Sequence, residues 1–143
     1  MDLVAQVVDI NLWAVLVAAA AAYVGGAIWY SQSVFGKAWR KMVVASTRVK
    51  DKDLMQPSAP MLIGQGFAQL IMAYVLAYLM GLLGAENWIE GVVVAGWIAL
   101  GFVVTMSLAD ALWKGTRKKL WAVETGYAVL SLLLMGAILG AWQ

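Results

Sequence analysis

Five polar side chains within otherwise apolar segments are the residues of this sequence best placed to do chemistry. The five are Gln65, Gln69, Thr105, Asp110 and Glu124. Each falls in the part of its segment that lies nearer to a group of basic residues. Polar and ionisable side chains inside membrane segments are costly and commonly mark a pathway or a binding site. We therefore predict a polar cavity that faces the basic side and binds a cation or a polar headgroup.

A purely structural explanation applies to the same residues and is the more frequent one. Asp110 can pair with Lys114 one helical turn later. Glu124 falls in the first turn of an apolar segment, where the helix dipole and the preceding Lys118 and Lys119 favour an anion. The two glutamines can form hydrogen bonds between helices, each worth about 0.6 kcal/mol on average.

Composition gives little support to enzymatic chemistry. The sequence has no cysteine and no histidine, which removes thiolate ligands, the commonest general base and the commonest metal ligand. It also contains no phosphate-binding loop, dinucleotide fingerprint or catalytic triad motif. We therefore expect a protein that is not an enzyme and that has no catalytic residues, cofactor or metal.

The elements that must position the five polar residues are four long apolar segments. They cover residues 11–30, 61–84, 88–113 and 120–142, and each is long enough to cross a hydrocarbon core of about 30 Å as a helix. Hydrophobic residues make up 64% of the chain and charged residues 13%, which a soluble domain could not bury. We predict an all-α fold, a four-transmembrane-helix bundle in a single domain over residues 1–143.

The basic residues set the orientation of this bundle. All ten lysines and arginines fall in residues 37–52 or 114–119, between the first and second and the third and fourth segments. Short cytoplasmic loops carry such an excess of bases. We therefore expect both termini on the outer side of a bacterial inner membrane, and a cytosol-facing polar cavity. The same rule explains the bases without any nucleic-acid partner.

The first basic loop begins with a short amphipathic pattern. Its apolar side chains recur at helical spacing, at Phe35, Ala38, Trp39, Met42 and Val43, and Lys37, Arg40 and Lys41 lie opposite. This pattern predicts an interfacial helix on the cytoplasmic leaflet, with its bases toward anionic lipid headgroups. Packing against the end of the bundle is the alternative, since the pattern alone does not separate the two.

Small residues repeat every four positions on the predicted helices. Ala18, Ala22 and Gly26 form such a packing stripe in the first segment, and Gly136 and Gly140 do so in the last. Small side chains let membrane helices approach closely and gain dispersion contacts. The stripes therefore predict a close bundle, and they leave open whether a second copy also packs on one of them.

Two stretches of the chain resemble a known family. They are Trp29-Tyr30-Ser31 followed by Phe35-Gly36-Lys37-Ala38-Trp39, and Gly126-Tyr127 followed by the run from Leu132 to Trp142. Together with the four-segment layout, they resemble the bacterial membrane family known as domain of unknown function 1761. The resemblance implies a small four-helix membrane protein and brings no established activity.

Two functions are compatible with these patterns. The leading hypothesis is a non-enzymatic packing or accessory protein that self-associates or joins a larger membrane complex. The alternative is a small oligomeric transporter or channel that uses the cytosol-facing polar cavity. A homo-oligomer with a wet axis would favour transport, and a co-purifying partner would favour the accessory role.

Overall fold

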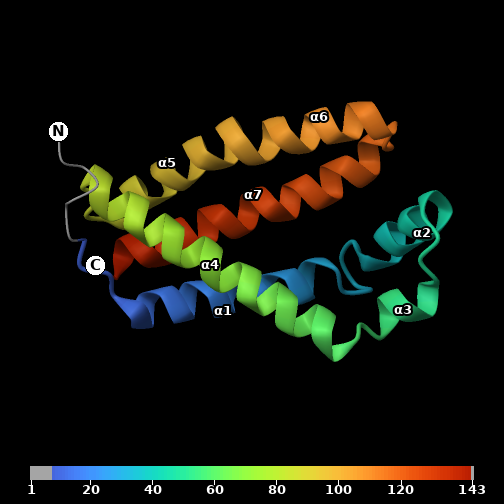
Figure 1. Cartoon of the computed structure of the whole chain (residues 1–143), viewed down its shortest axis with the longest axis horizontal. Helices are drawn as coiled ribbons and strands as arrows, with labels where there is room; N and C mark the ends of the chain where they lie inside the picture. Colours follow the sequence, from blue (N-terminus) through green and yellow to red (C-terminus); the bar gives the residue numbers. More distant parts are fainter. Residues whose placement is uncertain (1–7, 143) are drawn as a thin grey trace.

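The computed structural model describes residues 8–142, and that range is helical with no strand (Figure 1). Four stretches are long and apolar enough to cross a membrane: α1 (Leu12–Trp29), α4 (Ala59–Leu83), a continuous third span and α7 (Lys118–Ala141). The third span consists of α5 (Trp88–Ile98), the π-helix η1 (Ala99–Val104) and α6 (Thr105–Lys114). The predicted all-α fold with four membrane-length helices is confirmed.

The ends of these spans follow from local chemistry. Asn11 caps α1, and Asn87 caps α5 by accepting a hydrogen bond of 3.0 Å from the backbone N–H of Glu90. Gly84 ends α4 and Gly115 ends α6, each in a left-handed conformation with φ near 67° (68° and 66°). A residue without Cβ adopts that conformation at little cost, and the chain can therefore reverse direction after each helix.

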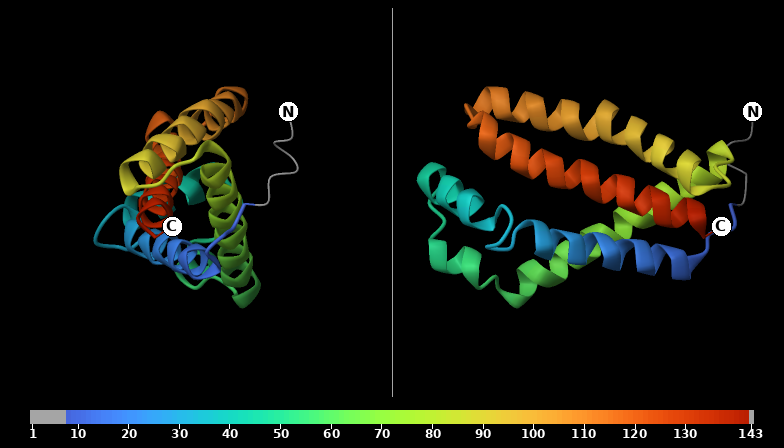
Figure 2. Two further views of the ribbon diagram at one scale, coloured as in Figure 1. Left: turned by 90° about the vertical axis from the view of Figure 1, so that its left-hand side faces the viewer. Right: turned by 180° about the vertical axis from the view of Figure 1, so that it is seen from behind.

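The last span, α7, lies at the centre of the bundle. It packs against α5, α1 and α4, and Figure 2 shows it between the third span and α1. Close approach to α5 depends on glycine, because a Cβ on Gly136 would overlap the carbonyl oxygen of Gly91. In the same way a Cβ on Gly140 would overlap the carbonyl oxygen of Asn87. Backbone contact of this kind supplies the dispersion energy that holds helices together in lipid.

The third span is the least covered of the four. Only 11% of its most apolar stretch is buried, against 33% for α1, 28% for α4 and 39% for α7. Trp97, Phe102, Met106 and Trp113 all expose most of their side chains. The third span therefore offers a large apolar surface to the bilayer or to another membrane protein.

Two short helices, α2 (Gly36–Ser46) and α3 (Asp51–Met55), lie beyond the end of α1 at the basic end of the bundle (Figure 1). The chain turns between α1 and α2, where the backbone N–H of Gly36 donates to the carbonyl oxygen of Ser31 at 2.9 Å. A Cβ on Gly36 would overlap the carbonyl oxygen of Tyr30, so this turn requires glycine. The predicted short helix is therefore separate from α1.

Candidate functional site

The five polar residues predicted to form one cavity are not brought together. Asp110 and Glu124 line a single pocket of about 170 Å³ between α6 and α7. Gln69 is buried in the bundle, whereas Gln65 is exposed one turn before it on α4. Thr105 is also exposed and donates its hydroxyl to the carbonyl oxygen of Gly101 at 2.7 Å. The expected single cavity is corrected to one acidic pocket and one separate buried contact, because α4 diverges from α6 toward the basic end (Figure 1).

A small hydroxyl cluster forms the floor of the acidic pocket. Ser107 is its centre: its hydroxyl accepts hydrogen bonds from the Trp121 indole at 3.1 Å and from Thr125 at 3.0 Å. The same hydroxyl donates to the carbonyl oxygen of Val104 at 3.0 Å. Every polar group of the floor is therefore satisfied, as the low-dielectric surroundings of a membrane helix require. The floor joins α6 to α7, and its central hydroxyl, that of Ser107, has no free donor or acceptor left.

The two carboxylates at the rim of the pocket differ in their partners. Asp110 forms an ion pair with Lys114 at 2.8 Å, the pairing that the structural explanation predicts. Both side chains of that pair are more than half exposed, and such pairs contribute little to stability. Glu124 instead accepts a hydrogen bond from the Trp39 indole at 3.1 Å, and none of the ion pairs within residues 8–142 involves it. No lysine or arginine nitrogen among residues 8–142 therefore lies within 4 Å of its carboxylate.

The buried contact joins three spans. Gln69, which is 1% exposed, donates its amide to the Tyr127 hydroxyl at 2.8 Å, and that hydroxyl donates to the carbonyl oxygen of Ala22 at 3.0 Å. The amide oxygen of Gln69 is buried without a hydrogen-bond partner. Because α4, α7 and α1 each contribute one residue, this contact fixes their relative positions in the half of the bundle near the basic end.

The aromatic side of α2 folds back onto the bundle. The Trp39 ring lies 4.7 Å from the Tyr30 ring, and the Phe35 ring lies 4.5 Å from that of Trp29. Met42 and Val43 are buried and pack against Leu120, the first apolar residue of α7. The apolar side of α2 therefore packs against the end of the bundle, which was the alternative, and the position of this helix at the lipid headgroups stays a prediction.

The three bases of α2 do not all remain free. Lys37 and Lys41 are both exposed. Arg40 is only 15% exposed, and its Nε lies 3.4 Å from a carboxylate oxygen of Asp51 in α3. Arg40 therefore joins α2 to α3, which leaves two bases of this helix available to a headgroup.

The residues of the predicted packing stripes lie at contacts between spans. Ala18, Ala22 and Gly26 are all buried on one side of α1. A Cβ on Gly26 would come within 2.6 Å of the Tyr127 hydroxyl. Gly136 and Gly140 face α5, as described above. The residues of both stripes therefore form contacts between helices of the same chain.

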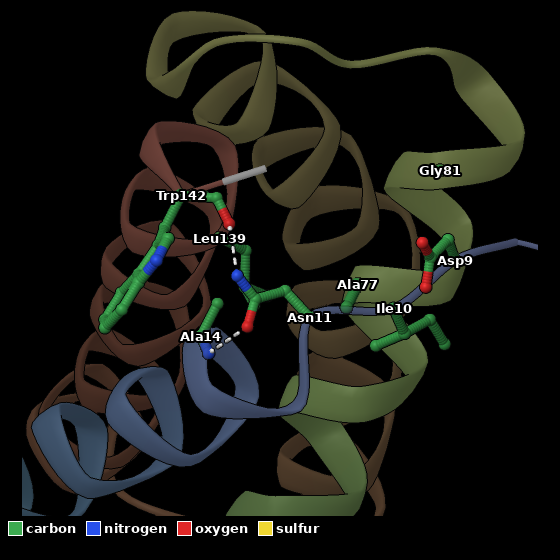
Figure 3. A pocket seen from close by; sticks show the side chains of 8 residues that line it. All are labelled: Asp9, Ile10, Asn11, Ala14, Ala77, Gly81, Leu139 and Trp142. Atoms are coloured by element: carbon green, nitrogen blue, oxygen red, sulfur yellow. Dashed lines mark hydrogen bonds between the residues drawn. The ribbon is translucent and has the colours of Figure 1, made fainter.

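A second pocket lies at the opposite end of the bundle, where α1 begins and α7 ends (Figure 3). Its volume is about 370 Å³, and it is lined by Asp9, Ile10, Asn11, Ala14, Ala77, Gly81, Leu139 and Trp142. Asn11 accepts from the backbone N–H groups of Trp13 and Ala14, and its amide donates to the carbonyl oxygen of Trp142 at 3.4 Å. Figure 3 shows the Asp9 carboxylate on the far side of Asn11 from Trp142. These contacts join the ends of the first and last spans and give Asn11 a structural role.

Sequence reasoning missed Ser107 as the centre of the hydroxyl cluster and Tyr127 as the centre of the buried contact. A signal was present for both, because a hydroxyl deep in an apolar segment must find a partner within the protein. It also missed the π-helix, for which the sequence gives no comparable signal.

The comparisons with known proteins identify a family without an assigned activity. The chain matches the family described as "Protein of unknown function (DUF1761)" over residues 13–140. No curated protein and no solved structure matches the chain.

Proposed function

The chain belongs to the family described as Protein of unknown function (DUF1761), and from this premise we propose that it is a non-enzymatic integral membrane protein that acts by packing against another membrane-spanning chain. The third span is the surface that makes this contact. Its apolar side chains are the least covered by the rest of the protein.

The main support for this proposal is the exposed position of Trp97 in the middle of the third span. Trp97 lies nine residues after Trp88, which places it about 14 Å along the third span and near the middle of a hydrocarbon core of about 30 Å. Its side chain is 70% exposed. Membrane tryptophans prefer the interfaces rather than the middle. Trp29, Trp39 and Trp121 donate their indole N–H groups within the protein, whereas Trp97 has no acceptor among residues 8–142. Exposed aromatic side chains of this kind are typical anchors of protein interfaces.

The third span also has an exposed glycine on which such an anchor could pack. Gly101 lies in η1, four residues after Trp97, and a Cβ built on Gly101 would meet nothing within 4 Å. A protruding indole and an open glycine on the same span suit a two-fold interface, in which each copy places its Trp97 over Gly101 of the other. A second copy of the chain is therefore the partner we favour.

We further propose the orientation and location expected from the basic residues. The basic end of the bundle, with α2, α3 and the turn between α6 and α7, faces the cytoplasm of a bacterial cell. Lys37 and Lys41 then face anionic headgroups, which would add about 1 kcal/mol of attraction for each base near the surface.

Because the sequence has no cysteine, single-cysteine variants test the association directly. Val93 lies one turn before Trp97 and is 52% exposed, so Val93→Cys should form a disulfide-linked dimer in membranes under mild oxidation. Ile63→Cys on α4, with 71% exposure, is the matched control and should stay monomeric. Trp97→Ala in the Val93→Cys background should lower the dimer yield severalfold. Equal cross-linking of Val93→Cys and Ile63→Cys would contradict the proposal, and a product with a different protein would assign the face to an accessory role.

The pocket between α6 and α7 supports a second candidate, a small oligomeric transporter or channel. Asp110 and Glu124 line a polar opening at the basic end, which a pathway between copies could use. A flux of cations through reconstituted vesicles that Glu124→Gln abolishes would favour transport over packing alone.

A further inference from the structure

An apolar pocket adjoins the acidic one. Beside it lies a pocket of about 240 Å³ between α4 and the third span, and Val103 lines both pockets. On α7 the two pockets are lined by neighbouring turns, since Ala128 belongs to the acidic pocket and Leu132 to the apolar one. The two pockets are therefore adjacent, and we call them together the amphipathic groove.

The π-helix gives this groove a continuous wall on the third span. Ile98 and Val103 lie five residues apart across η1, and the wider π-helical turn places both in the apolar pocket. Ser107 and Asp110 then continue the wall toward the basic end at ordinary helical spacing. From Ile98 to Asp110 the groove runs for about 18 Å, slightly more than half of a hydrocarbon core of about 30 Å. Its length therefore corresponds to one leaflet.

The chemistry of the polar end selects for positive charge. The Ser107 hydroxyl is saturated with hydrogen bonds, and the charged groups that line the pocket and can meet a ligand are the two rim carboxylates. Lys114 compensates Asp110, whereas Glu124 has one oxygen bonded to Trp39 and no basic partner within residues 8–142. A carboxylate at the edge of the bilayer gains most from a cation that also donates hydrogen bonds.

We propose that the amphipathic groove binds one phospholipid whose headgroup carries a primary ammonium ion, such as phosphatidylethanolamine, from the leaflet at the basic end. The ammonium ion donates to Glu124 and lies beside Asp110, and an acyl chain fills the apolar part between α4 and Leu132. A free metal ion or small amine would leave the apolar part of the groove without an occupant. Trp97 and Gly101 line neither part of the groove, so the site does not depend on the proposed association.

Native mass spectrometry of the purified protein tests the site. The protein is delipidated and offered equal amounts of dioleoyl-phosphatidylethanolamine, the corresponding phosphatidylcholine and the corresponding phosphatidylglycerol. We expect one retained ethanolamine lipid, about tenfold preferred over the choline lipid, because choline carries no N–H to donate. Glu124→Gln should remove that preference, and Glu90→Gln at the opposite end of the bundle is the matched control that should keep it.

A second variant tests whether binding needs the space in the groove as well as the charge of Glu124. Ala128→Phe fills the groove between Glu124 and Leu132 and should abolish retention of all three lipids, with an unchanged melting temperature showing that the bundle is folded. Equal retention of the three lipids by the unaltered protein would overturn the proposal. Preferential retention of phosphatidylglycerol, or an ethanolamine preference that survives both variants, would overturn it as well.

Discussion

Tyr127 shows how one residue can fix three membrane helices. Its hydroxyl accepts from Gln69 on α4 and donates to the Ala22 carbonyl on α1, while its own helix is α7. The ring fits because Gly26 has no side chain: a Cβ there would lie 2.6 Å from the Tyr127 oxygen and 2.9 Å from the ring carbon that bears it. The glycine of the α1 stripe thus makes room for a polar contact as well as for a backbone.

Gly26→Ala should therefore destabilise the bundle although it removes no favourable contact. The new methyl group would push the Tyr127 ring away from Gln69 and Ala22, and such overpacking typically costs about 1–3 kcal/mol. Gly64→Ala on α4 is the matched control, because a Cβ at Gly64 would meet nothing within 4 Å. Thermal unfolding in detergent measures both variants, and equal melting temperatures for the two would show that the Gly26 contact is not tight.

At the scale of the helices, apolar length and small-residue spacing were sufficient to predict four spans. The spacing of Gly136 and Gly140 indicated a close approach but could not identify α5 as the partner, because that pairing depends on which helices become neighbours in the folded chain. Likewise, Gln65 and Gln69 were expected on one cavity wall. The crossing of α4 over α1 buries only Gln69, and crossing angles follow from packing that periodicity does not report.

The α1 stripe gives a prediction at this scale. Ala22 is fully buried where α1 meets its neighbours, so Ala22→Leu should force the helices apart and lower the free energy of unfolding by about 1–3 kcal/mol. Ala27→Leu, on an exposed position of the same helix, adds the same atoms toward lipid and should be nearly silent. The melting temperatures in detergent compare the two, and an unchanged value for Ala22→Leu would refute a packed stripe.

For the whole molecule, the distribution of charge separates two unlike ends. The basic end carries α2 and α3, whereas the other end holds the Asn11 contact to Trp142 and the capped start of α5 (Figure 1). The sequence predicted this polarity, because all lysines and arginines fall between the first and second spans or between the third and fourth. It could not predict that Arg40 of α2 would pair with Asp51 or that the apolar side of α2 would pack against Leu120, since both partners lie elsewhere in the chain.

The distribution of bases predicts the orientation of the whole molecule in the membrane. The bases lie in short segments next to the spans, where they resist translocation, so the basic end should remain in the cytoplasm. Lys50→Cys lies between α2 and α3, and Glu86→Cys lies in the turn between α4 and α5; both positions are exposed, and each variant has a single thiol. An impermeant maleimide should label Glu86→Cys in intact cells and Lys50→Cys only after the membrane is permeabilised. Labelling of Lys50→Cys in intact cells would reverse the orientation and would place the acidic pocket, with the amphipathic groove, in the outer leaflet.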